Sequence, residues 1–245
     1  MDARYLQYTT PDGSDASPSA GGDTSARPTG QQVFLRTLLG DGLPDGTYAH
    51  LFWLHGRETV WVRTVEQGEW ALRRTDRDGK HDVYMGVGIG PDAGPHHRIS
   101  IETALGVLGL VGDIDIAHEL HKLNPTLPPD QASALKLVDV LGADPTLLVH
   151  SGHGIQTWHL FEQPWIFKDA ADKQRAIQLE ADWQAYINEL AQASFGWEFD
   201  SVGDLARIMR VPGTWNAKDR AETVPVKLLR WPDARYTPAR LEALC

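Results

Sequence analysis

Short stretches of alternating apolar and polar residues recur along the chain, and this period of two is typical of half-buried strands. The turn His55-Gly56-Arg57 separates two of them, and the stretch DVYMGVGI carries glycines where another group can approach the backbone closely. The stretch 106–116 is apolar until Asp113, so it is predicted to be a buried strand that ends in polar residues. The predicted strands are 48–54, 59–63, 70–73, 82–89, 106–116, 146–150, 155–161 and 224–231.

A helical period is clearest in residues 170–193. Leu179, Trp183, Tyr186 and Leu190 fall on one face of this predicted helix, while acids and amides fall on the other. Further helices are predicted at 32–39, 129–141 and 238–244. Because strands and helices mix without a regular alternation, the pattern predicts an α+β fold rather than a doubly wound sheet.

Residues 1–30 differ from the rest of the chain, because they are rich in Gly, Ser, Thr, Pro and Asp and have few large apolar side chains. Such a segment buries too little surface to offset its chain entropy. It is predicted to be a disordered or loosely attached tail. Residues 31–245 are long enough for one domain, or for two small lobes around a shared core.

The net charge of −10 argues against indiscriminate coating of nucleic acid, but the charge is uneven. Residues 205–240 carry eight Lys or Arg against three acids, which fits either a nucleic-acid surface or a solvated basic face. The single cysteine, Cys245, cannot build a Cys-based zinc site. Without a long apolar run or a signal-peptide pattern, the protein is expected to be cytoplasmic and to have no membrane partner.

Asp113 and Asp115 are the first candidate for chemistry. Residues two apart in a strand point to the same face, so the two carboxylates would lie side by side. Adjacent carboxylates repel unless a cation lies between them, and hard oxygen ligands suit Mg²⁺ or Mn²⁺. The alternative is a polar strand end in solvent.

The run Ser151-Gly152-His153-Gly154 joins two predicted strands and is the second candidate. Its glycines allow close approach of a ligand, and its backbone N–H groups with Ser151 could hold phosphate oxygens. Gln156 and Trp158 follow on one face of the second strand. The alternative is an ordinary glycine-rich hairpin.

The third candidate begins with Phe199-Asp200 and continues through residues 204–218. A short basic helix carrying Arg207 and Arg210 on one face is predicted to lead into Pro-Gly-Thr, followed by Asn216 and Lys218. Clustered guanidinium and ammonium groups suit a triphosphate. The alternative is a capped helix with ordinary surface charges.

Taken in this order, the three features resemble the archaeo-eukaryotic primase superfamily, in particular the primase-polymerases of plasmids, phages and other mobile elements. The paired acids Asp113 and Asp115, the run from Ser151 to Gln156, and Phe199-Asp200 are similar to its three motifs. The run R-x-x-R-x-P-G-T-x-N-x-K extends the third. Residues 84–87 and His121-Lys122 also resemble segments that flank the first motif.

The resemblance implies a primase-type catalytic core, with an RRM-like mixed sheet and an N-terminal αβ lobe around one cleft. It implies template-directed nucleotidyl transfer, in which Asp113, Asp115 and Asp200 hold two Mg²⁺ or Mn²⁺ ions about 3.5–4 Å apart and no zinc. The implied partners are single-stranded DNA template and primer, nucleoside triphosphates, and a helicase or another replication or defence protein. The nucleotide-binding residues it implies are Ser151, Gly152, Gly154, Gln156, His159, Arg207, Arg210, Asn216 and Lys218.

The sequence departs from the family at Gln156, where the motif often has a histidine that is expected to contact the phosphates. Glutamine keeps a hydrogen-bond donor but cannot carry a positive charge. His159 or His153 could substitute for it.

Two other functions stay open. A primase-like replication or defence protein could bind DNA without synthesis, and the Gln156 departure favours it. A nuclease would need the acids but not the phosphate-binding run that ends at Lys218. A zinc protease is excluded, because His118 and His121 are three residues apart whereas the zincin helix requires four.

Overall fold

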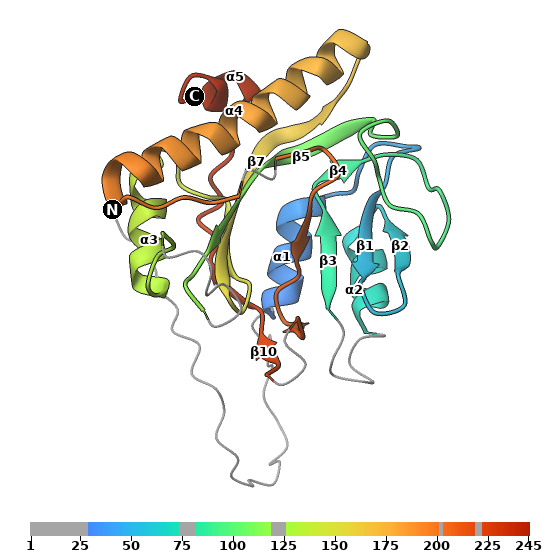
Figure 1. Ribbon diagram of the computed structural model, residues 1–245. Helices are drawn as coiled ribbons and strands as arrows, with labels where there is room; N and C mark the ends of the chain where they lie inside the picture. Colours follow the sequence, from blue (N-terminus) through green and yellow to red (C-terminus); the bar gives the residue numbers. More distant parts are fainter. Residues whose placement is uncertain (1–28, 74–81, 119–125, 201–202, 219–221) are drawn as a thin grey trace, which may run out of the picture.

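The computed structural model describes residues 29–73, 82–118, 126–200, 203–218 and 222–245. They fold into two larger antiparallel sheets with helices packed on them, and a two-stranded antiparallel sheet (Figure 1). The helices are α1 (Gly30–Leu39), α2 (Val65–Leu72), α3 (Gln131–Val140), α4 (Ala170–Phe195) and α5 (Pro238–Glu242). The strands are β1 (Ala49–Trp53), β2 (Glu58–Val62), β3 (Val83–Gly86), β4 (Gly88–Ile89), β5 (Gly106–Asp115), β6 (Leu147–His150), β7 (Gly154–Ile166), β8 (Ile208–Arg210), β9 (Trp215–Asn216), β10 (Val224–Pro225) and β11 (Lys227–Arg230).

The larger sheet has the strand order β11-β6-β7-β5-β4, and its long central strands β5 and β7 position the candidate site. Their register pairs Asp113 with Gln156 and Gly112 with Thr157. Because side chains alternate between faces, Asp113 and Gln156 lie on one face, the site face, while Thr157 and His159 lie on the other, the helix face. Figure 1 shows α4 lying across the sheet with α3 beside it.

The smaller sheet has the order β2-β1-β3-β8, and α1 lies between it and the larger sheet (Figure 1). Phe34 of α1 meets Trp158 of β7 edge to face, with ring centroids 5.6 Å apart. The chain passes from β3 to β4, and so between the sheets, through Val87. A side chain at Gly86 would collide with the buried ring of His50, so glycine is required there. Burial, together with the positive charge of Arg98, lowers the pKa of His50 to about 4.

Side-chain caps define where the helices begin. Thr29 and Gln32 form a capping box at the start of α1, and Thr64 and Gln67 form another at α2. Asp169 caps the start of α4. These caps satisfy backbone N–H groups that the first helical turn leaves without partners.

The α+β prediction is confirmed, and most predicted elements lie within a few residues of the observed ones. Two predictions are wrong. Residues 70–72 belong to α2 rather than to a strand, because the capping box at Thr64 starts a helix there. The predicted basic helix is instead a turn followed by β8, since Ile208–Arg210 pairs with β3.

Two predictions fall outside the described residues. One is the disordered or loosely attached tail, of which residues 1–28 are not described. The other is the resemblance of His121-Lys122 to a segment that flanks the first motif. Thr29 and Gly30 are described, and they form the start of α1 rather than part of the tail. No helix among the described residues is long and apolar enough to cross a membrane.

Candidate active site

Asp113 and Asp115 lie on the site face of β5, at the end of an otherwise apolar strand. Both side chains are half-buried. The guanidinium of Arg207 donates to Asp113, with Arg207 Nη2 2.7 Å from Asp113 Oδ2, and both side chains remain about a quarter exposed. A cation therefore already neutralises the first carboxylate.

Gln156 ties this carboxylate to β8, because its two amide ends are bonded to different elements. Its Nε2 donates to Asp113 Oδ1 over 3.4 Å, and its Oε1 accepts the backbone N–H of Arg210 over 2.9 Å. The side chain is only 4% exposed. Gln156 thus links β5, β7 and β8, which are three segments far apart in sequence.

Arg210 is buried beside Asp82 and Tyr84. One guanidinium nitrogen donates to Asp82 Oδ1, and the guanidinium carbon lies 4.8 Å above the centre of the Tyr84 ring. The same Asp82 oxygen accepts the backbone N–H of Ala217 over 2.9 Å. Burial raises the pKa of the Tyr84 hydroxyl, against the opposing effect of the Arg210 charge.

The turn after β6 meets the segment after β8. Asn216 donates from Nδ2 to the Ser151 carbonyl over 2.8 Å, and its Oδ1 accepts the backbone N–H of Lys218 over 3.1 Å. Gly152 has a φ of +103°, and a Cβ there would lie 3.0 Å from Asn216 Cβ and 2.5 Å from Val224 Cγ2. Glycine is therefore required for this contact. The Ser151 hydroxyl donates within the turn, to the Gly154 carbonyl.

Behind Arg207 lies a buried carboxyl group, Glu180 of α4. It is 0% exposed, and among the described residues neither of its oxygens has a hydrogen-bond partner. Burial raises its pKa well above the ordinary value, and the negative charge of Asp204 raises it further, whereas Arg207 lowers it. Asp204 caps its own turn by accepting the N–H of Ala206. Burial therefore favours the protonated, neutral form of this carboxyl group.

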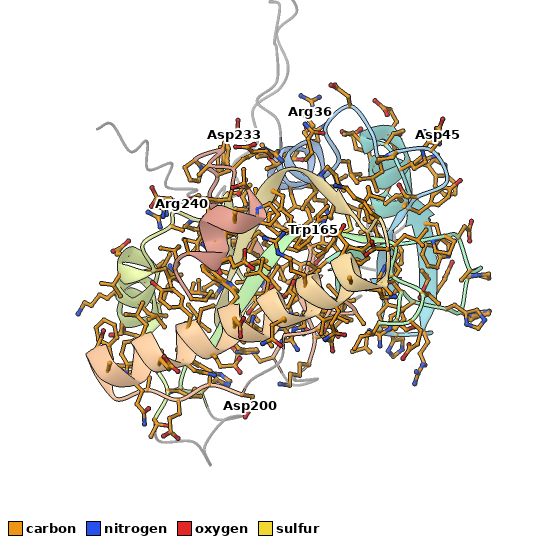
Figure 2. All side chains as sticks on the ribbon, turned by 90° about the horizontal axis from the view of Figure 1, so that it is seen from above. Arg36, Asp45, Trp165, Asp200, Asp233 and Arg240 are labelled. Atoms are coloured by element: carbon orange, nitrogen blue, oxygen red, sulfur yellow. The ribbon has the colours of Figure 1, made fainter. Side chains whose placement is uncertain are left out.

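Two predicted site residues lie apart from this cluster. His159 is fully buried on the helix face, where Nε2 lies 3.2 Å from the Ala143 carbonyl and the ring packs on Trp183. The structure thus gives it no path to a nucleotide on the site face. Asp200 is exposed on the segment after α4, at the margin of the molecule in Figure 2.

Two of the three predicted metal ligands, Asp113 and Asp115, lie on the same face of β5. The paired oxygen donors Asp113 and Asp115 suit a hard divalent ion, and the Arg207 contact marks a position where a cation is favourable. Among the described residues, no three His, Cys, Asp or Glu side chains are close enough together to hold a metal ion. The third ligand, Asp200, stays a prediction.

Comparison with known proteins bears on the fold. No family model and no curated protein sequence matches the chain. Among solved structures, the AEP domain of the cyanophage S-2L primase-polymerase is similar over 87% of this chain and 96% of its own, with 17% identity and a TM-score of 0.53. The chain has a primase-polymerase fold. Two structures of the primase RepB′, one of its catalytic domain in complex with initiator DNA, match 87% of this chain at 12% and 14% identity, with TM-scores of 0.47 and 0.48.

Within this primase-polymerase fold, the sequence interpretation missed Asp82 and Glu180. Asp82 is the first residue of the predicted strand 82–89, and its only signal was its position next to residues 84–87, which resemble the family. The other three acids of α4, Asp172, Asp182 and Glu189, are all at least partly exposed. The burial of Glu180 depends on the chain returning past α4 at Gly203, where a Cβ would lie 2.8 Å from the Glu180 carbonyl. No local sequence pattern signals that contact.

Proposed function

We propose that this protein is a DNA primase-polymerase, which joins nucleotides on a single-stranded DNA template with the help of divalent metal ions. The observation that carries the proposal is the Gln156 link. It brings the paired-acid strand, the glycine-rich turn and strand, and the Arg-containing strand to one place, on a primase-polymerase fold. The paired acids, the glycine-rich run and the arginines of residues 204–218 were selected from sequence alone, so their convergence supports a shared site.

Asp113 and Asp115 are proposed to hold Mg²⁺ or Mn²⁺, with Asp200 as the third carboxylate. The bound ions would neutralise the triphosphate and lower the pKa of the attacking 3′-hydroxyl. For Asp113 to bind metal, the Arg207 guanidinium must leave its present partner. A phosphate of the incoming nucleotide is a suitable new partner, because one guanidinium group can donate two parallel hydrogen bonds to two oxygens of a phosphate.

Arg210, Asn216 and Lys218 are proposed to position the nucleotide. Lys218 is exposed and supplies a mobile point charge, whereas Arg210 is held in place by Asp82. Ser151, Gly152 and Gly154 shape the turn beside them. The contribution of these residues is alignment and charge neutralisation, without a covalent intermediate.

A DNA-binding protein without synthesis is the second candidate, and the Asp113–Arg207 ion pair favours it. In such a protein the arginine would permanently replace the cation that the carboxylates would otherwise bind. Measurement of Mn²⁺ binding to the wild type and to Arg207→Gln separates the two. A synthetic enzyme binds Mn²⁺ in both forms, whereas a protein with a permanent ion pair binds it only in the variant.

The proposal is tested by incubating the full chain with single-stranded DNA, Mn²⁺ and labelled nucleotides, with and without a primer. When a primer is supplied, the protein is expected to extend it. When no primer is supplied, the protein is expected to synthesise new primers. DNA binding with no incorporation under either condition would support the second candidate. Degradation of the DNA would indicate a nuclease instead. A helicase or other replication partner would have to supply strand separation.

A further inference from the structure

Asp82 has no assigned role in the proposed reaction, yet it joins two parts of the candidate site through one oxygen atom. Its Oδ1 accepts from the guanidinium of Arg210 and from the backbone N–H of Ala217. Its side chain is 11% exposed and that of Arg210 is 7% exposed. Ion pairs with so little exposure are screened weakly by salt and depend strongly on both partners.

The two contacts fix different groups. The ion pair sets the direction of the Arg210 guanidinium, which also lies over the Tyr84 ring. The hydrogen bond from the Ala217 N–H anchors the chain between Asn216 and Lys218. It therefore fixes the position of the Lys218 backbone relative to the site. Asn216 ties the same segment to Ser151. The Asp82 carboxylate therefore positions the buried guanidinium of Arg210 and the backbone that carries the exposed side chain of Lys218.

We propose that Asp82 is a positioning residue for the triphosphate of the incoming nucleotide. It holds Arg210 and the Asn216–Lys218 segment in the arrangement that phosphate groups bind. This inference rests on the proposed function, because it requires that a nucleotide binds at this site. Asp82 itself repels phosphate, so its contribution is made only through the groups that it orients.

The number of phosphates distinguishes positioning from a general effect on folding. Each phosphate group of the ligand adds a contact whose strength depends on the positions of the Arg210 and Lys218 cations. If these cations are misplaced, a triphosphate therefore loses more affinity than a monophosphate. Partial loss of folded protein instead weakens every ligand by the same factor. The affinities of nucleoside mono-, di- and triphosphates therefore form an internal control.

Two substitutions separate the two contacts. Asp82→Asn keeps an oxygen that can accept the Ala217 N–H but removes the charge that pairs with Arg210. Asp82→Ala removes both. Glu242→Gln is the control, because Glu242 forms a well-defined ion pair with Arg175 on α4 outside the site, with 2.6 Å between Arg175 Nη2 and Glu242 Oε2.

The experiment measures binding of the three nucleotides to each full-length variant in Mn²⁺, together with hydrogen exchange of the segment 211–218. Asp82→Asn is expected to weaken triphosphate binding about tenfold, a change of ~1.4 kcal/mol, and monophosphate binding much less. Asp82→Ala is expected to lose more affinity and also to exchange faster at Ala217, while Glu242→Gln matches the wild type.

Equal weakening of all three nucleotides, or none, in Asp82→Asn would overturn the inference while leaving the proposed function intact. A wild type that binds no triphosphate would overturn the proposed function, and this inference with it.

If Asp82→Asn does not fold, Arg210→Lys applies the same test from the other partner of the ion pair. Lysine keeps the charge beside Asp82 and the Ala217 bond, but loses the planar guanidinium. The same selective loss for triphosphate is expected, and its absence would reject the proposal.

Discussion

Strand β7 presents polar side chains to both faces of the larger sheet, and the two faces differ in how they accommodate them. On the site face, both amide ends of Gln156 are bonded, to Asp113 and to the Arg210 backbone. On the helix face, Thr157 Oγ1 and His159 Nδ1 are buried, and no group in the described part of the chain forms a hydrogen bond with either atom. Both groups of residues are buried, so burial alone does not distinguish them.

The two faces also differ in charge. Where the helices pack, burial lowers the pKa of His159 to about 4 and raises that of Glu180, so it favours the neutral form of both groups. The site face instead keeps the ion pairs Asp113–Arg207 and Asp82–Arg210. The candidate site is therefore distinguished by charged groups that connect distant segments of the chain, whereas the buried polar groups of the helix face lie where helices pack.

The largest effect is expected from the paired acids. Replacing Asp113 and Asp115 together with Asn should reduce nucleotide incorporation by at least about 100- to 1,000-fold, the scale seen when a charge-stabilising group is lost. Folding should be retained, because like-charge repulsion is relieved. Incorporation rate and melting temperature are measured together. Wild-type incorporation by the double variant would remove these acids from the mechanism.

The comparison of the two faces is tested most sharply by Gln156→Leu and His159→Leu, which make the same replacement on opposite sides of β7. Gln156→Leu leaves the Arg210 N–H without an acceptor, which costs about 1–3 kcal/mol, and it should reduce incorporation about tenfold or more. His159→Leu should leave kcat/KM for incorporation unchanged, with only its stability altered. Steady-state incorporation and chemical denaturation provide the two measurements. The account of the two faces fails if His159→Leu is the more damaging to kcat/KM.

A smaller effect, confined to stability, is expected from Glu180→Gln. The raised pKa in the folded state means that Glu180 retains its proton in the folded chain at pH values where the unfolded chain has lost it. Stability is therefore highest below the unfolded pKa near 4.5 and falls as pH rises toward the folded pKa. Glutamine removes this dependence, so the variant should gain about 1–3 kcal/mol relative to wild type at pH 8 and little at pH 4. Urea denaturation at both pH values measures it. An equal change at both would mean that Glu180 does not titrate as proposed.

Most of the elements could be predicted from sequence because their patterns are local. The period of α4 and the alternation of β7 depend on neighbouring residues alone. The strand predicted at 70–73 was wrong because the capping box at Thr64 and Gln67 outweighs the aromatic and apolar residues that follow. Residues 204–210 were misassigned because pairing of β8 with β3, a contact distant in sequence, overrides a helical spacing of arginines.

The sequence selected residues that the structure brings into contact, such as Asp113 and Gln156, but it did not predict the contacts of each residue. Gln156 was expected to face the phosphates, and this stays a prediction. In the structure both of its amide ends are hydrogen-bonded to protein groups. His159 was included for its residue type and its distance along the chain from Gln156. An odd spacing of three reverses the face of a strand, which is why it lies among the helices.

The measurement that tests the central claim most directly is the identity of the product made on a defined template. The wild type is given a homopolymeric oligo-dT template with Mn²⁺ and each labelled nucleotide in turn, beside the Asp113→Asn, Asp115→Asn double variant. A primase-polymerase incorporates adenine nucleotides alone, and the double variant incorporates none. Incorporation that ignores the template, or that persists in the double variant, would contradict template-directed synthesis at this site.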